Sequence, residues 1–209
     1  MSQFALPFGR PPAARRFVIG AANDRAVRML ERWPTWPVAA ALLTGPRKSG
    51  RSLLARTFAA QAGARVIDDA ERAEETQLFH AWNEAQAARR PLLIVADQSP
   101  PAWTIRLPDL RSRLLATPLL AVGDPDETMM RQLLDLHFER LALPAPPNLV
   151  RWLARRLERT HLAAMLAVER IDAEQSASRA RLSIPAARAT LLASGMLAPD
   201  HEPEAQTES

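Results

Sequence analysis

Between two apolar runs of the chain lies the octapeptide Gly45-Pro46-Arg47-Lys48-Ser49-Gly50-Arg51-Ser52. The run before it, 38–43, predicts a strand, and the run after it, 53–62, predicts a helix. A strand, a glycine-bounded loop and a helix N-terminus form a phosphate-binding loop, because their backbone N–H groups face an anion. The sequence therefore predicts a P-loop, and the alternative is an ordinary turn that contains two glycines.

The octapeptide departs from the P-loop pattern G-x-x-x-x-G-K-[ST] at one position. Gly45, Gly50 and Ser52 match the pattern, and Ser52 is placed to reach a magnesium ion. Arg51 stands where the pattern has lysine, and a planar guanidinium does not simply replace an ammonium at a cramped site. Binding of ADP or ATP with Mg²⁺ by these four residues is an open expectation, whereas ATP hydrolysis by the chain itself is not favoured.

Composition limits the classes of protein to which the chain can belong. Its 47% of hydrophobic residues suffice for one packed domain with at most a small appendage. The absence of cysteine excludes disulfides, cysteine-ligated zinc and thiol catalysis, and the four histidines form no spaced metal cluster. No apolar run approaches the roughly 20 residues of a membrane span, and the N-terminus lacks a signal-peptide layout. We therefore expect a cytoplasmic protein without a membrane partner.

The N-terminal segment 1–16 is rich in proline and is expected to be extended. An extended peptide of this kind can insert Leu6 and Phe8 into an apolar pocket of a partner while Gln3 forms a hydrogen bond at its rim. Pro7 lowers the ordering cost because its own backbone angle is preset. Two alternatives explain the spacing as well: a disordered terminus, or a segment folded back on the core of the chain.

Alternating strand and helix patterns follow the N-terminal segment. Strands are expected at 38–44, 64–69, 92–96 and 119–122, and helices at 24–33, 50–62, 74–89 and 109–115. Helical character begins near Thr104 and is interrupted at Pro108, Asn23 is a possible N-cap, and Gly63 is a possible C-cap. The alternation predicts an α/β fold with a parallel sheet. The continuous apolar run at 92–96 predicts a central strand.

The C-terminal third of the chain has a purely helical pattern. Helices are expected at 126–139, 147–158, 160–175 and 185–194, and the polar, acidic segment 199–209 is expected to be disordered. The sequence therefore predicts a helical subdomain behind the α/β part.

The short apolar stretch 66–69 ends in two acids. Behind a P-loop, Asp68 stands where a magnesium-orienting carboxylate belongs, and Asp69 stands where a general base for water belongs. The alternative is a plain strand that ends in a helix N-cap. The stretch thus predicts either a Walker B strand or a structural strand end.

These features together resemble an AAA+ module, and more finely that of the DnaA/Hda group, over residues 17–192. The resemblance is carried by the opening segment 17–23, the Walker B-like stretch 66–69, the following helix 75–83, the sensor-1-like turn 97–101 and the arginine-finger-like segment 110–114. It implies an AAA+ α/β subdomain over 17–123 with a shortened parallel sheet, followed by a small all-helical lid over 124–198.

The resemblance assigns roles to single residues. Asp97 corresponds to sensor 1, and Arg113 corresponds to the arginine finger that acts in trans, with Arg111 as its rival. Without the resemblance, a surface ion pair with Asp109 explains Arg113 equally well. The sensor 2 arginine is replaced, and Arg159, one turn earlier, is a possible substitute.

The chain departs from the family pattern in other ways. Leu162 occupies the sensor 2 position, and most of a strand–helix unit is missing before the Walker B stretch. A competing register makes 64–67 the preceding strand and 92–97 the Walker B strand. The first register is preferred because the helix 79–83 and the turn 99–101 then match the family.

The resemblance also implies a partner for the N-terminal peptide. Residues Gln3, Leu6, Pro7 and Phe8 resemble the peptide with which Hda-type regulators hold the DNA sliding clamp. DnaA carries a C-terminal helix-turn-helix domain, and the sequence behind the expected lid offers nothing to form one. The resemblance therefore points to the regulatory branch of the group.

This branch implies a negative regulator of replication initiation that associates with the nucleoid and the replisome. The clamp would bring the chain to DnaA, DNA would be contacted only through the clamp, and Arg113 would promote hydrolysis of the ATP held by DnaA. A homodimer is compatible with this role. Two alternatives are a clamp-tethered adaptor that stimulates no ATPase and a stand-alone P-loop ATPase. The net charge of +4 argues against a DNA-binding module.

Overall fold

The computed structural model describes residues 17–178 and 181–198. Its strands are β1 (Ala40–Thr44), β2 (Arg65–Ile67), β3 (Leu92–Ala96) and β4 (Leu119–Ala121). Its helices are α1 (Asp24–Glu31), α2 (Arg51–Ala62), α3 (Glu75–Ala88), α4 (Pro108–Ala116), α5 (Glu127–Arg140), α6 (Pro147–Arg156), α7 (His161–Ser178) and α8 (Ile184–Ala193), with short 3-10 turns η2 (Trp33–Thr35) and η3 (Ala70–Arg72). Each strand and helix overlaps a segment that the sequence predicts.

The strands form a parallel sheet in the order β2-β3-β1-β4. In β1 and β3 every residue is buried, because helices cover both faces of the sheet. The central position predicted for β3 is therefore confirmed. In the described part of the chain the sheet has 4 strands, which agrees with the shortened sheet predicted from the sequence.

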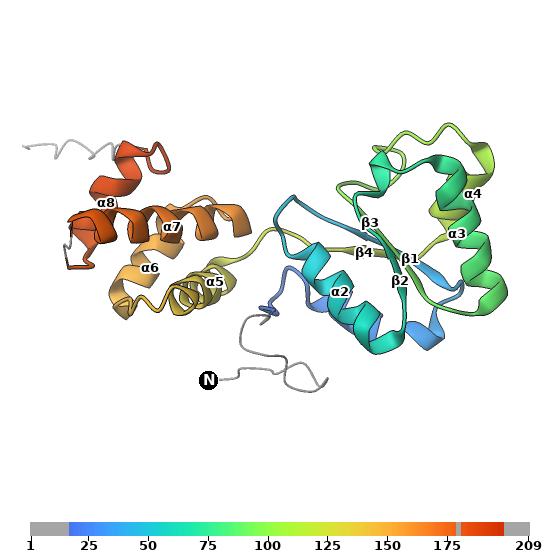
Figure 1. Cartoon of the computed structure of the whole chain (residues 1–209), viewed down its shortest axis with the longest axis horizontal. Helices are drawn as coiled ribbons and strands as arrows, with labels where there is room; N and C mark the ends of the chain where they lie inside the picture. The colour runs from blue at the N-terminus through green and yellow to red at the C-terminus, as the bar shows by residue number, and fades with distance from the viewer. Residues whose placement is uncertain (1–16, 179–180, 199–209) are drawn as a thin grey trace, which may run out of the picture.

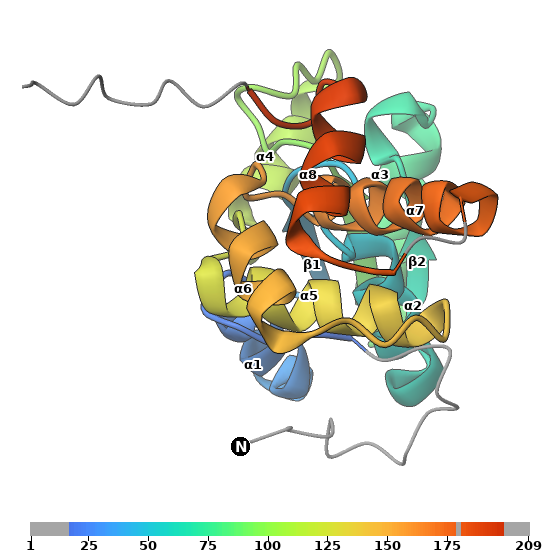
Figure 2. The ribbon, with the colours of Figure 1, turned by 90° about the vertical axis from the view of Figure 1, so that its left-hand side faces the viewer.

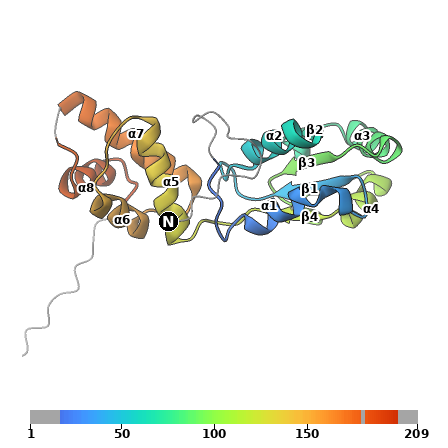
Figure 3. The same ribbon diagram turned by 90° about the horizontal axis from the view of Figure 1, so that it is seen from below.

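Two helical layers enclose the sheet (Figures 1 and 3). Ala41 and Leu43 of β1 pack with α1 and α2, whereas Ala40 and Leu42 pack with α3 and α4. Successive side chains of a strand point to opposite faces, so one strand serves both cores. The chain leaves β1 through α2 on one face and leaves β3 through α4 on the other. The carboxyl ends of β1 and β3 therefore flank the crevice in which open α/β sheets bind ligands.

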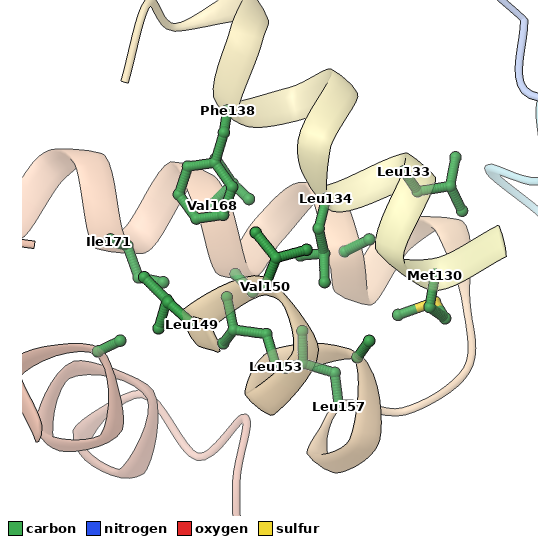
Figure 4. Close-up of a cluster of buried hydrophobic side chains, with 14 of the residues drawn as sticks. Met130, Leu133, Leu134, Phe138, Leu149, Val150, Leu153, Leu157, Val168 and Ile171 are labelled. Atoms are coloured by element: carbon green, nitrogen blue, oxygen red, sulfur yellow. The ribbon is translucent and has the colours of Figure 1, made fainter. Parts of the chain in front are cut away.

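Helices α5 to α8 form a second, all-helical body, which lies beside the sheet in Figure 1 and in front of it in Figure 2. Figure 4 shows its core, where side chains of α5, α6 and α7 meet, among them Leu134, Leu149, Leu153 and Val168. Asp126 caps α5 by accepting a hydrogen bond from the Met129 N–H. Among the described helices, none combines the length and apolarity that a membrane crossing requires.

Two local predictions need correction. Residues 104–107 are not helical, and Pro108 begins α4 rather than interrupting it, because proline suits the first turn, where its missing N–H is not needed. Asn23 precedes α1, but its side chain does not cap the helix. It reaches back instead, accepting from the Gly20 N–H and donating to the Val18 carbonyl. The C-cap prediction for Gly63 is confirmed, with φ +62°.

Candidate functional site

The predicted P-loop connects β1 to α2 and needs both of its glycines. Gly45 has φ +152°, and a Cβ atom there would lie 2.4 Å from the carbonyl oxygen of Val122. Gly50 has φ +86°, and a Cβ atom there would lie 2.9 Å from the ring of Phe17. Side chains other than hydrogen do not fit at such positions. The loop therefore owes its shape to these two residues.

The backbone of the loop can hold an anion. Helix α2 begins directly behind Gly50, and the first N–H groups of a helix have no partner within it. Ser49 lies beside them with a side-chain hydroxyl that is buried and has no hydrogen-bond partner in the described part of the chain. The N–H groups at the start of α2 suit one phosphate of a ligand.

Arg51 does not point its cation into this anion site. Its side chain donates from Nη1 to the carbonyl oxygen of Ala96 and from Nη2 to Oδ1 of Asp97, at 2.5 Å for the second contact. The residue is only 8% exposed. Its guanidinium thus joins the P-loop to the carboxyl end of β3.

Asp97 is the centre of a small charged network. Its second oxygen, Oδ2, lies 3.3 Å from Nη1 of Arg47, another P-loop residue. Glu71 in η3 accepts hydrogen bonds from the N–H groups of Asp97 and Gln98. Sequence reasoning gave Asp97 a role but missed Arg47 and Glu71. The basic character of the loop was a usable signal for Arg47, whereas no sequence pattern marks Glu71.

The two acids behind β2 lie away from this network. β3 separates β2 from β1, so Asp68 follows a strand that is not adjacent to the strand feeding the P-loop. The Oδ1 atom of Asp68 accepts a hydrogen bond from the N–H of Asp69, and both residues are exposed. The structure therefore brings Asp97, rather than Asp68 or Asp69, into contact with Arg51.

These contacts decide which parts of a Mg²⁺–nucleotide site the residues fit. The backbone N–H groups at the start of α2 fit a phosphate group. Arg51 stands at the position of the cation that a P-loop directs at the β- and γ-phosphates, but it is bonded to Asp97 and Ala96 instead. In the described residues no group of three His, Cys, Asp or Glu side chains could hold a metal ion. The site therefore fits a phosphate group, while the Arg51 guanidinium as placed is bonded within the chain.

Arg113 lies on α4, on the face of the sheet opposite α2. Its guanidinium carbon is 4.3 Å from the ring centroid of Phe79 and 4.8 Å from that of Trp82, both on α3. Its Nη1 atom is buried and has no hydrogen-bond partner among the described residues. The contacts of Arg113 are thus with aromatic rings of its own chain, while Arg111 on the same helix is exposed.

Arg159 is exposed and lies in the turn between α6 and α7, not on a helix. Leu162, the residue at the sensor 2 position, lies in the first turn of α7 and is half-buried. The predicted clamp-binding residues Gln3, Leu6, Pro7 and Phe8 lie outside the described residues.

The opening segment joins the two bodies of the molecule. Phe17 packs with the core around α1 and α2, whereas Val18 and Ala22 pack against the lid core. The N–H of Gly123, in the linker behind β4, donates to the carbonyl of Ala22 at 2.8 Å. The P-loop, this segment and the linker therefore meet at one place.

Solved structures with the same architecture include replication initiators and a branch migration motor. Domain III of the Thermotoga maritima replication initiation protein DnaA has a TM-score of 0.72 and 14% identity, covering 88% of this chain and 95% of that one. The T. maritima RuvB Holliday junction branch migration motor has a TM-score of 0.64 and 16% identity, covering 81% and 67%. A replication initiator DnaA bound to AMPPCP and single-stranded DNA has a TM-score of 0.62 and 13% identity, covering 78% and 66%.

The fold is that of an AAA+ module. No protein-family model matches the chain, and identities of 13–16% establish the fold alone. The expected architecture, an α/β AAA+ part with a shortened parallel sheet and an all-helical lid, is confirmed. The subdomain boundary between residues 123 and 124 and the roles of the site residues stay predictions.

Proposed function

We propose that this AAA+ module is a regulator of replication initiation that does not itself hydrolyse ATP. The likeness to DnaA structures supports the link to replication, and the buried contact of Arg51 with Asp97 and Ala96 supports the lack of hydrolysis. This contact commits the residue at the catalytic lysine position to the chain's own backbone and carboxylate. A module built in this way acts through the proteins that it binds.

The first partner in this proposal is the DNA sliding clamp, held by the N-terminal peptide. Leu6 and Phe8 enter an apolar pocket of the clamp, and Gln3 bonds at its rim. The tether raises the local concentration of the chain near replicating DNA, so a second, weaker contact becomes effective. Removal of residues 1–8 or the double change Leu6→Ala/Phe8→Ala is expected to abolish clamp binding and to leave the unfolding curve unchanged. Clamp affinity that survives the truncation contradicts this part.

The second partner is ATP-bound DnaA. A cation placed against the γ-phosphate in trans accelerates hydrolysis by about 10³–10⁵, and the family resemblance gives this role to Arg113. In this proposal Arg113 leaves the rings of Phe79 and Trp82 when DnaA binds. Arg111, which is already exposed, is the rival donor from the same helix.

The experiment is a single-turnover ATPase assay of DnaA with this chain and a DNA-loaded clamp. Stimulation that Arg113→Ala removes and Arg111→Ala retains supports the finger; the reverse result assigns the role to Arg111. Arg56→Ala, an exposed arginine of α2 on the opposite face of the sheet, is the matched control. Folding of each variant is checked by its unfolding midpoint.

The second candidate function is a clamp-tethered adaptor that stimulates no ATPase. The observation in its favour is the packing of Arg113 on Phe79 and Trp82, which gives that residue a structural use. Two results together select this function. The ATPase rate of DnaA does not rise when the chain and loaded clamp are added, and the chain still links DnaA to the clamp in a pull-down.

A stand-alone ATPase is the third possibility and is the least compatible with the Arg51 contacts. It would be supported by ATP hydrolysis in the isolated chain that the substitution Asp68→Ala abolishes.

A further inference from the structure

A hollow lined by arginines lies on the lid, away from the P-loop. It measures about 240 Å³ and is lined by Asn148, Arg151, Trp152, Arg155, Arg156 and Ile184. We call it the arginine hollow. Five of these residues belong to α6, and Ile184 opens α8. Three guanidinium groups and no carboxylate line it, so it is a basic site with an aromatic wall.

The charges of the arginine hollow are only partly balanced. Arg155 lies 3.2 Å from Glu127 of α5, in an ion pair that is itself largely exposed. Arg156 lies over the ring of Trp152 at 5.0 Å, and Arg151 donates to the carbonyl of its own helix at Pro147. Among residues 17–178 and 181–198, Glu127 is the one carboxylate within ion-pair distance of these guanidiniums. An acidic ligand therefore finds unneutralised charge there.

An acidic segment of the same chain follows the helix that borders this hollow. Residues 199–209 carry four carboxylate side chains, no lysine and no arginine. Two of the carboxylates, Glu202 and Glu204, are two residues apart, and Pro203 between them favours an extended backbone. In an extended chain such residues are about 6.6–7 Å apart on one face. Arg151 and Arg155, four residues apart on a helix, are about 6 Å apart.

The described chain ends within reach of the hollow. Gly195, with φ +68°, ends α8 in a turn, and the N–H groups of Met196 and Leu197 both donate to the carbonyl of Leu191. Met196 and Leu197 then pack against the lid core, as do Trp152 and Ile184. From residue 198 an extended chain covers up to about 14 Å to Glu202 and about 21 Å to Glu204, and α8 is about 15 Å long.

We propose that the acidic segment 199–209 docks in the arginine hollow of its own lid, with Glu202 and Glu204 paired to Arg151 and Arg155. The segment then neutralises the basic site and fixes the end of the chain along α6. Each pair is exposed and individually weak, so the contact depends on salt and is reversible.

The test uses the full chain with one nitroxide label at Gln206→Cys, which is a unique site because the sequence has no cysteine. In low salt the label is expected to broaden the NMR signal of the Trp152 indole N–H. The indole signals of Trp33, Trp36, Trp82 and Trp103, which lie in the α/β part, keep their intensity. At 1 M salt, where the screening length is about 3 Å, the broadening is expected to disappear.

Two charge variants make the result specific. Glu202→Gln/Glu204→Gln and Arg151→Gln/Arg155→Gln should each abolish the broadening, whereas Arg56→Gln on the distant helix α2 should preserve it. The tail variant changes no described residue, so it stays informative if the arginine variant unfolds. A Trp152 signal that is unaffected by the label in low salt overturns the proposal. Broadening that persists in the tail variant overturns it as well.

Discussion

A single residue, Arg51, bonds the P-loop to the sheet instead of offering its cation to a ligand. A guanidinium carries five donors in a rigid plane and can bond two acceptors at once, whereas an ammonium is a compact point charge. Arg51 uses this geometry to hold Ala96 and Asp97 together. Residue 51, which in a P-loop contacts the ligand, here links the loop to the end of β3.

Arg51→Ala is therefore expected to lower the free energy of unfolding by about 1–3 kcal/mol, because a carbonyl and a half-exposed carboxylate lose a charged donor. Arg47→Ala is the matched control. The Arg47 side chain is 59% exposed, and loss of such a surface pair costs at most about 1 kcal/mol. Urea unfolding curves measure both values. Equal losses in the two variants contradict the buried role of Arg51.

His137 is a second residue with a measurable consequence. Burial, helped by the charges of Arg140 and His161, lowers its pKa from 6.5 to about 4. Burial also lowers the pKa of His161. The unfolded chain therefore binds more protons than the folded chain between pH 6.5 and 4, so stability falls as the pH is lowered through this window.

His137→Gln is expected to reduce this acid sensitivity, which appears as a smaller drop of the unfolding midpoint between pH 7 and pH 4.5. His80→Gln is the control, since that histidine is exposed on α3. If the pH dependence of the unfolding midpoint is unchanged in His137→Gln, burial of His137 does not explain the acid sensitivity.

At the scale of one element, the P-loop is held by packing as much as by charge. Its two glycines let Val122 and Phe17 approach the backbone closely. The sequence predicted the loop, because glycine spacing and flanking apolar runs are local signals. It did not predict the neighbours, since Val122 and Phe17 are far from the loop in the chain.

Gly45→Ala is expected to destabilise the protein by about 2 kcal/mol or more, because its Cβ would meet a backbone oxygen that cannot move aside. Gly63→Ala, at φ +62° with nothing within 4 Å of the added atom, should cost only about 1 kcal/mol. Thermal unfolding of the two variants compares them. A smaller loss at Gly45 than at Gly63 refutes the packing argument.

At the scale of the whole molecule, the sequence predicted the alternation of elements and the buried position of β3 from local patterns. It did not predict the contacts that define the site. Arg51 meets Asp97 across 46 residues, and Arg113 meets Phe79 on the preceding helix. Such pairs depend on which strands and helices become neighbours, and no periodicity in one segment encodes that.

The whole molecule is expected to respond little to nucleotide. A ligand that binds only the folded state stabilises it by RT ln(1 + [L]/Kd). With Arg51 bonded to Asp97 rather than to a phosphate, 1 mM ATP with Mg²⁺ should raise the free energy of unfolding by less than about 1 kcal/mol. Differential scanning calorimetry with and without nucleotide measures this change. A stabilisation of several kcal/mol would mean that Arg51 releases Asp97 and turns to the ligand.

The opening segment has a mechanical consequence. Phe17, partly buried, packs against the core around α1 and α2, and Val18 and Ala22, also partly buried, pack against the lid core. A pulling force on the segment before Phe17 is therefore transmitted to both the α/β part and the lid. It acts beside the linker that follows β4. A partner bound to the N-terminal peptide would therefore apply force to segment 17–22 and could shift the angle between the lid and the sheet.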